Sequence, residues 1–107
     1  MIDWPRVKEL RDEVGPEDFD EVVDLFLEEV EEVIAKLRDG DRAQLEQDLH
    51  FLKGSAMNLG FDDFSQLCLA GERKSAQGEA GSVDLIEIVD KFEVSKVGFL
   101  AELPSLS

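Results

Sequence analysis

A histidine, a lysine and a glycine lie close together near the middle of the chain. His50 is the only histidine among the 107 residues, Lys53 follows it three positions later and Gly54 four positions later. Imidazole gains and loses a proton near neutral pH, and its unprotonated nitrogen is a nucleophile that can carry a covalent group. On a helix, residues three and four positions apart lie on the same surface. The spacing therefore indicates an imidazole flanked by a cation and by open space.

The elements that position these residues are helices. Every long segment has the hydrophobic period of a helix, and none alternates like a strand. Five helices are expected, from a cap at Asp3 to about Val14 and over about 17–38, 42–59, 62–76 and 83–100, with a frayed tail at 101–107. Asp41 and Ser82 are expected to cap the third and the fifth helix.

The connections between these helices are short, which favours antiparallel neighbours. The sequence therefore predicts an all-α fold, an antiparallel up-down-up-down four-helix bundle with an additional short N-terminal helix. A chain of this length forms one domain. We expect that domain to cover 1–107, with the core bundle at about 17–100.

The third helix has one clear apolar stripe. Its members fall within an arc of roughly 80° and are Leu45, Leu49, Leu52, Ala56 and Leu59. His50 lies about 140° from the centre of this arc, Gly54 about 180° and Lys53 about 80°. The imidazole is therefore expected to face solvent and not the core. An ordinary exposed histidine without a role is the alternative.

Three neighbours favour a role for the imidazole. Gly54 is placed in mid-helix, where glycine costs on the order of 1 kcal/mol relative to alanine, and it opens space one turn from His50. Lys53 can place an ammonium near an anion on the imidazole, and Met57 adds an exposed apolar contact. Close helix packing at Gly54 and plain surface solubility at Lys53 are the alternatives. The set describes an anion-carrying imidazole that faces a partner.

The charge of the chain limits its partners. The net charge is −15, from 26 acidic and 11 basic residues. Nucleic acid and anionic membranes carry the same sign, so they are excluded as partners. The acidic run of the second helix is interpreted as a solvated face. No apolar run approaches the roughly 20 residues that span a bilayer, and the N-terminus lacks the regions of a signal peptide. A phosphoryl group in this field needs a cation nearby, which gives Lys53 added weight.

Other chemistries fail because their residues are missing. One histidine and one cysteine are too few for the usual zinc or iron site. Ser55 lies well round the helix from His50, and a helix interior offers no free amides for an oxyanion hole. No glycine-rich phosphate loop is present. Cys68 is expected to be a small buried residue and not a reactive thiol, and as the only cysteine it predicts a reducing cytoplasm.

The run from His50 to Gly60 resembles the signature of histidine phosphotransfer (HPt) domains, the carriers of multistep phosphorelays. That signature has His-x-Leu-Lys-Gly-Ser, a Leu-Gly helix end, and then a Leu-Cys pair and a glutamate or glutamine on the next helix. These later positions are filled here by Leu59-Gly60, Leu67-Cys68 and Glu72. The match covers about residues 42–76, and the five-helix layout extends it over nearly the whole chain. Two residues depart from the pattern, since Gly71 replaces a larger apolar residue and Leu49 replaces a small one.

The resemblance implies a role for each matching residue. His50 would accept a phosphoryl group on Nε2, Lys53 would neutralise its charge, and Gly54 would leave room for it and for a docking partner. Ser55 would help to support the site, and Glu72 would hydrogen-bond and orient the imidazole. The helical wheel places Glu72 at the edge of its helix's core stripe, where an unpaired glutamate is the alternative.

The resemblance also implies partners. Response-regulator receiver domains would exchange the phosphoryl group through a phospho-aspartate, and a hybrid histidine kinase would supply it. Mg²⁺ would belong to the receiver, so the chain itself needs no cofactor or metal. We expect a cytoplasmic, monomeric phosphoryl carrier and not an enzyme. The alternatives are an HPt-like interaction module that is never phosphorylated, or the kinase-substrate domain of a larger chemotaxis-type or hybrid kinase.

Overall fold

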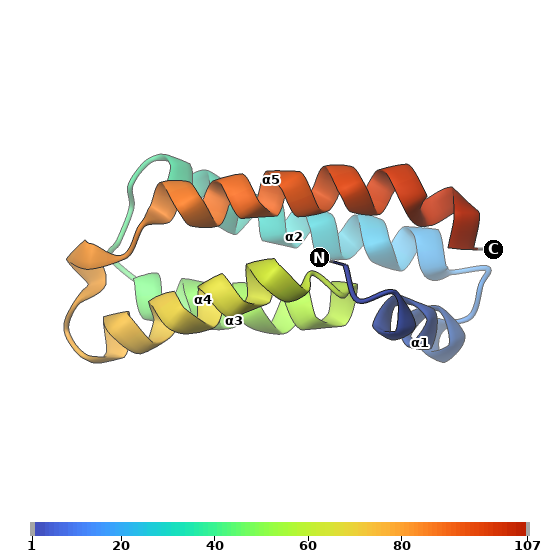
Figure 1. Ribbon diagram of the computed structural model, residues 1–107, viewed down its shortest axis with the longest axis horizontal. Coiled ribbons are helices and arrows are strands. Elements are labelled where there is room, and N and C mark those ends of the chain that lie inside the picture. Colours follow the sequence, from blue (N-terminus) through green and yellow to red (C-terminus); the bar gives the residue numbers. More distant parts are fainter. Residues whose placement is uncertain (1, 107) are drawn as a thin grey trace.

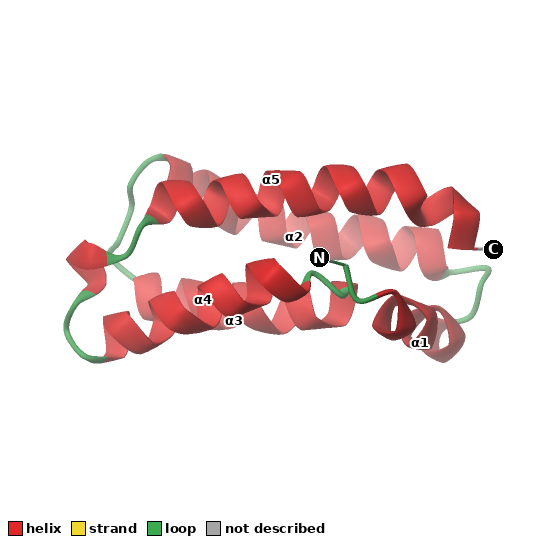
Figure 2. Cartoon of the chain, in the orientation of Figure 1, coloured by secondary structure: helices red, strands yellow, loops and turns green. Residues whose placement is uncertain are grey.

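The computed structural model describes residues 2–106, which form a rod of 43 × 22 × 21 Å. Its five α-helices are α1 (Trp4–Val14), α2 (Phe19–Arg38), α3 (Leu45–Leu59), α4 (Asp62–Ala76) and α5 (Leu85–Glu102). Two 3₁₀ turns, Ala80–Ser82 and Leu103–Leu106, precede and follow α5. The four longer helices lie side by side along the rod, and α1 lies at one end (Figure 1). No strand occurs between residues 2 and 106, which confirms the all-helical prediction (Figure 2).

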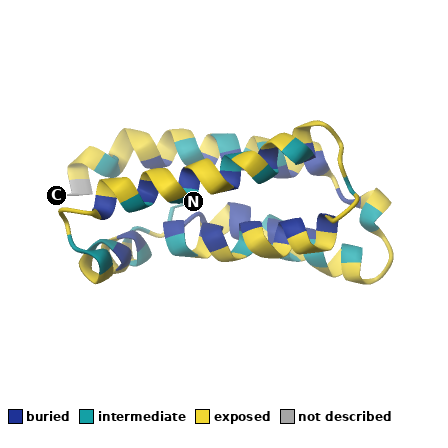
Figure 3. Ribbon diagram, turned by 180° about the vertical axis from the view of Figure 1, so that it is seen from behind, coloured by how far each residue is buried: buried dark blue, intermediate teal, exposed yellow. Residues whose placement is uncertain are grey.

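The core lies between the inward faces of the helices (Figure 3). All five residues of the stripe predicted for α3 are buried. Four phenylalanines from α4, α5 and the turn before α4 fill the centre, with ring centroids 5.2 to 6.3 Å apart: Phe61, Phe64, Phe92 and Phe99. Edge-on and tilted aromatic pairs at such distances stabilise a core beyond their buried area. Leu27 of α2 also belongs to this core.

Several helix ends differ from the predicted ones. The third helix begins at Leu45 and not near residue 42, because the Arg42 guanidinium donates hydrogen bonds to the carbonyls of Ala80 and Val83. The Asp41 side chain accepts from the Ala43 amide in the turn before α3, and Gln44 stands at the cap position, so the prediction of Asp41 as cap was wrong. α5 begins at Leu85, and its cap is Asp84, whose side chain accepts from the Glu87 amide, so the prediction of Ser82 as cap was wrong.

The C-terminal end is more ordered than predicted. α5 continues to Glu102 and a 3₁₀ turn follows, so the expected fraying over residues 101–106 was wrong. Leu103 packs against the hydrophobic core, which explains why the chain stays folded there. Ser107 lies outside the described residues.

Gly71 brings α4 close to α3. A Cβ atom at this position would lie 2.8 Å from Leu49 Cδ1 and 3.2 Å from Val83 Cγ1, both too short for ordinary contact. The buried Leu49 side chain therefore occupies the space that a larger residue at position 71 would need. The two departures from the HPt signature are thus complementary, since a large residue on α3 faces a missing side chain on α4.

This complementarity predicts a coupled stability effect. Gly71→Ala should lower the free energy of unfolding by about 1–3 kcal/mol through overpacking against Leu49. Leu49→Ala should cost about 2–5 kcal/mol because it leaves a cavity. The double variant should lose less than the sum, because the new methyl fills part of that cavity, and urea unfolding of all four proteins measures the difference.

Gly98→Ala is the matched control for this cycle. Gly98 lies within α5, and a Cβ there would have no atom within 4 Å. The same substitution should therefore stabilise the protein by about 0.5–1 kcal/mol. Additive losses in the Gly71 and Leu49 cycle would show that the two side chains do not compete for space.

The structure also bears on Cys68 and on membrane-spanning segments. Cys68 is fully buried, which was expected, and burial raises the pKa of its thiol to about 12. A thiol that stays protonated is a poor nucleophile. Among residues 2–106, no helix has both the length and the apolar character needed to cross a bilayer.

Candidate functional site

His50 projects outward from the middle of α3. Its side chain is 68% exposed, whereas the adjacent Leu49 is completely buried. The helical phase that puts Leu49 against α4 therefore turns the next residue toward solvent. This exposed position is the one that the helical wheel predicted.

Glu72 of α4 connects the imidazole to Lys53. One carboxylate oxygen, Oε2, lies 2.9 Å from His50 Nδ1, and the other, Oε1, lies 2.9 Å from Lys53 Nζ. Glu72 follows Gly71 in sequence just as His50 follows Leu49, so the close approach of these helices at Gly71 also brings the carboxylate to the imidazole. The glutamate is therefore paired, and the alternative of an unpaired edge residue was wrong.

This contact sets the tautomer of the imidazole. The Lys53 ammonium beside Oε1, with a further contribution from His50, lowers the pKa of the Glu72 carboxyl below its usual range. An ionised carboxylate can only accept hydrogen bonds, so Nδ1 must carry the proton that it donates to Oε2. In neutral imidazole the other nitrogen then holds a lone pair. In that neutral tautomer, the lone pair is therefore on His50 Nε2, the nitrogen that does not face Glu72.

Lys53 is a cation of the site. Its side chain is 23% exposed, and its ammonium pairs with Glu72 instead of reaching the imidazole directly. Because the ammonium and the imidazole contact the same carboxylate, they are neighbours in the folded protein. The chain thus keeps a positive charge beside His50 despite its net charge of −15.

The remaining residues of the predicted site lie on two different sides of α3. Gly54 is exposed, and a Cβ there would find no atom within 4 Å, so it does leave open space one turn from His50. Met57 extends the same exposed surface, with 59% of its area accessible. Ser55 is buried on the other side, and no described hydrogen bond links its hydroxyl to His50, Lys53 or Glu72.

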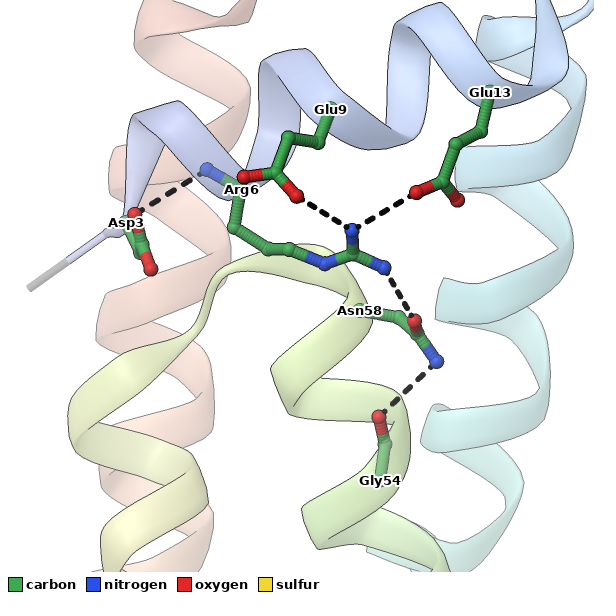
Figure 4. A network of polar contacts seen from close by, with 6 residues as sticks. All are labelled: Asp3, Arg6, Glu9, Glu13, Gly54 and Asn58. Carbon is green, nitrogen blue, oxygen red and sulfur yellow. Dashed lines mark hydrogen bonds and ion pairs between the residues drawn. The ribbon is translucent and has the colours of Figure 1, made fainter.

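Two residues next to this surface were missed in the sequence. Asn58 donates from Nδ2 to the Gly54 carbonyl, and its Oδ1 accepts from Arg6 Nη2 (Figure 4). Asn58 stands four positions after Gly54, so its helical spacing was a signal that could have been used. Arg6 comes from α1, and nothing local in the sequence relates it to α3. Across residues 2–106, no group of three or more His, Cys, Asp or Glu side chains is arranged to hold a metal ion.

The ionised state of Glu72 predicts a pH-dependent stability. Its folded-state pKa is depressed, so its stabilising contribution is present above the unfolded value of 4.5 and is lost as the pH falls through the folded pKa. Urea unfolding should therefore show wild type more stable than Glu72→Gln at pH 7, with the difference disappearing toward pH 3. Glu32→Gln, at an exposed position of α2, controls for the loss of one negative charge. A difference that persists unchanged at pH 3 would mean that Glu72 acts by packing alone.

A comparison with protein families matches residues 21–103 to the Hpt domain. The match includes the four longer helices apart from the first two residues of α2, and it leaves α1 outside. No curated protein and no solved structure shows significant similarity to the chain.

The matched segment contains His50, Lys53, Gly54 and Glu72, which the folded chain arranges at one exposed site. Hpt domains carry phosphoryl groups in histidine phosphorelays and are carriers rather than enzymes. The match covers most of the chain, and the chain therefore belongs to the Hpt domain family.

Proposed function

We propose that this protein accepts a phosphoryl group on His50 Nε2 from the phospho-aspartate of a receiver domain and passes it to another receiver. The observation that carries the proposal is the contact of 2.9 Å between His50 Nδ1 and Glu72 Oε2. It holds the proton on the inner nitrogen and leaves the lone pair on the outer one. The 68% exposure of the side chain gives a partner access to that lone pair.

The transfer step follows from this arrangement. The Nε2 lone pair attacks phosphorus, the N–P bond forms, and the bond from phosphorus to the aspartyl oxygen breaks as the carboxylate leaves. Positive charge that develops on the imidazole is stabilised by Glu72 through the Nδ1 proton. Lys53 offsets the charge of the equatorial phosphoryl oxygens, and Gly54 leaves room for the in-line approach. Ser55 supports the site from the buried side of α3.

The proposal includes the setting of the reaction. The partners are response-regulator receiver domains and a hybrid histidine kinase. Mg²⁺ is held by the receiver, and this chain needs no cofactor of its own. The carrier acts as a monomer in the cytoplasm, without kinase activity.

We also infer that the four longer helices alternate in direction, as in an up-down-up-down bundle. Ion pairs between α2 and α5 support this order. Glu31, earlier in α2, pairs with Lys96, later in α5, while Arg38, later in α2, pairs with Glu93, earlier in α5. This crossed order is the one that antiparallel helices produce.

Transfer of a radioactive phosphoryl group tests the function. A receiver domain labelled on its aspartate is mixed with this protein in the presence of Mg²⁺. We expect label on this protein in an acid-labile, base-stable form, and its removal when an unlabelled second receiver is added. Binding to a receiver without any labelling would support the interaction module instead. Labelling only by a kinase domain with ATP would support the kinase-substrate domain.

A further inference from the structure

Asn58 connects the turn of α3 that contains Gly54, here called the Gly54 turn, to the N-terminal helix α1. Its Nδ2 lies 3.2 Å from the Gly54 carbonyl oxygen, and its Oδ1 lies 2.9 Å from Arg6 Nη2. The residues of this connection are shown in Figure 4, in which α1 crosses the end of α3. A single amide side chain thus joins a turn of α3 to a cation from α1.

The Gly54 turn needs such support. Glycine in mid-helix has no side chain to restrict its backbone, so it weakens the helix at that position. A second hydrogen bond to the Gly54 carbonyl holds this turn without placing any atom in the space beside it. The extra hydrogen bond thus stabilises the helix at Gly54, while the surface next to His50 stays open.

The position of Arg6 is itself fixed. The Asp3 amide donates to the Gly60 carbonyl at 2.7 Å, which fastens the start of α1 to the end of α3. The other terminal nitrogen of the guanidinium, Nη1, lies 3.3 Å from both Glu9 Oε2 and Glu13 Oε1. The rigid fork of arginine therefore presents Nη2 to Asn58 in one orientation.

We propose that Arg6 and Asn58 are positioning residues that hold the Gly54 turn in the form on which a receiver docks. The inference rests on the proposed function, but it concerns residues that do not touch the phosphoryl group. Arg6 belongs to α1 and lies outside the family match, whereas Asn58 lies within it, so the support joins a matched helix to an unmatched one. Because His50, Lys53 and Glu72 keep their own contacts, the support acts on docking and leaves the transfer step intact.

Single-turnover transfer from a labelled receiver, measured at increasing concentrations of this protein, tests this proposal; KM here is the half-saturating concentration and kcat the limiting rate. Arg6→Met and Asn58→Ala should each raise KM by about fivefold, the equivalent of one lost hydrogen bond, while kcat stays within about twofold. Lys8→Met is the matched control, because it removes the same charge from an exposed position of the same helix, and it should leave KM unchanged. The variant with both Arg6→Met and Asn58→Ala should resemble each single variant, since the two residues act in one chain of contacts.

Hydrogen exchange gives a readout that does not depend on transfer. Amides of residues 54–58 should exchange faster in Arg6→Met and in Asn58→Ala than in wild type, with α5 unchanged. Alanine has the higher helix propensity, so slower exchange in Asn58→Ala would overturn the proposal. An unchanged KM in both variants, or an equal rise in Lys8→Met, would also overturn it. If no receiver transfers label to wild type, the proposed function fails, and the exchange rates alone decide whether this support exists.

Discussion

His50→Gln is expected to abolish transfer from every receiver that labels the wild-type protein. Glutamine has no nucleophilic ring nitrogen, so no phosphoryl group can be accepted at this position. The side chain is 68% exposed, and substitutions at such positions change stability by about 0.5 kcal/mol or less. Circular dichroism and urea unfolding should therefore match those of wild type, while the labelled band disappears.

The place of the imidazole matters as much as its presence. Adding Gln47→His to His50→Gln restores one histidine to an exposed position of α3, one turn earlier. That histidine stands outside the contact with Glu72 that orients His50, so the double variant should also stay unlabelled. Label that persists in His50→Gln would show that another residue is the acceptor, and the proposed site would be wrong.

Gly54→Leu should block transfer while making the protein more stable. A Cβ at position 54 would have no atom within 4 Å in the free protein, so we expect a leucine on this exposed surface to be accommodated and to gain about 0.5–1 kcal/mol of helix propensity. In the complex the same side chain would occupy the space that the receiver and the phosphoryl group need. A displacement of the reacting groups by about 1 Å costs on the order of 100-fold in rate. Single-turnover transfer should fall by at least this factor.

Gly98→Leu is the matched control for this substitution. Gly98 is also an exposed helical glycine with open space, but it belongs to α5, whereas His50 and its contacts belong to α3 and α4. Both leucine variants should therefore be at least as stable as wild type, and only Gly54→Leu should lose transfer. Equal transfer in the two variants would show that position 54 does not face the partner.

The all-helical fold and the outward direction of His50 could be predicted because both depend on local periodicity. A helix turns by a fixed angle at each residue, so the apolar stripe of α3 fixes which side chains face solvent. Gly60 ended the third helix where expected because glycine readily adopts the left-handed conformation, with φ of 74°, that the helix end requires.

Two of the helix ends that were wrong depend on distant contacts. Arg42 leaves the third helix to bond carbonyls in the connection between α4 and α5. Leu103 extends the order of the C-terminal end because it packs on a core built from other helices. In both cases the contact is made with residues far along the chain, and the local sequence pattern carries no information about it.

The sequence by itself determined which residue carries the imidazole and the surface on which it lies, since residue type and helical period are enough for both. Only the tertiary structure decided which side chains contact it and hold the helices around it. It paired Glu72 with His50 and Lys53, matched Leu49 to the absent side chain of Gly71, and joined Arg6 to Asn58. Each of these contacts joins two helices whose separation and relative rotation are set by the packing of the whole core.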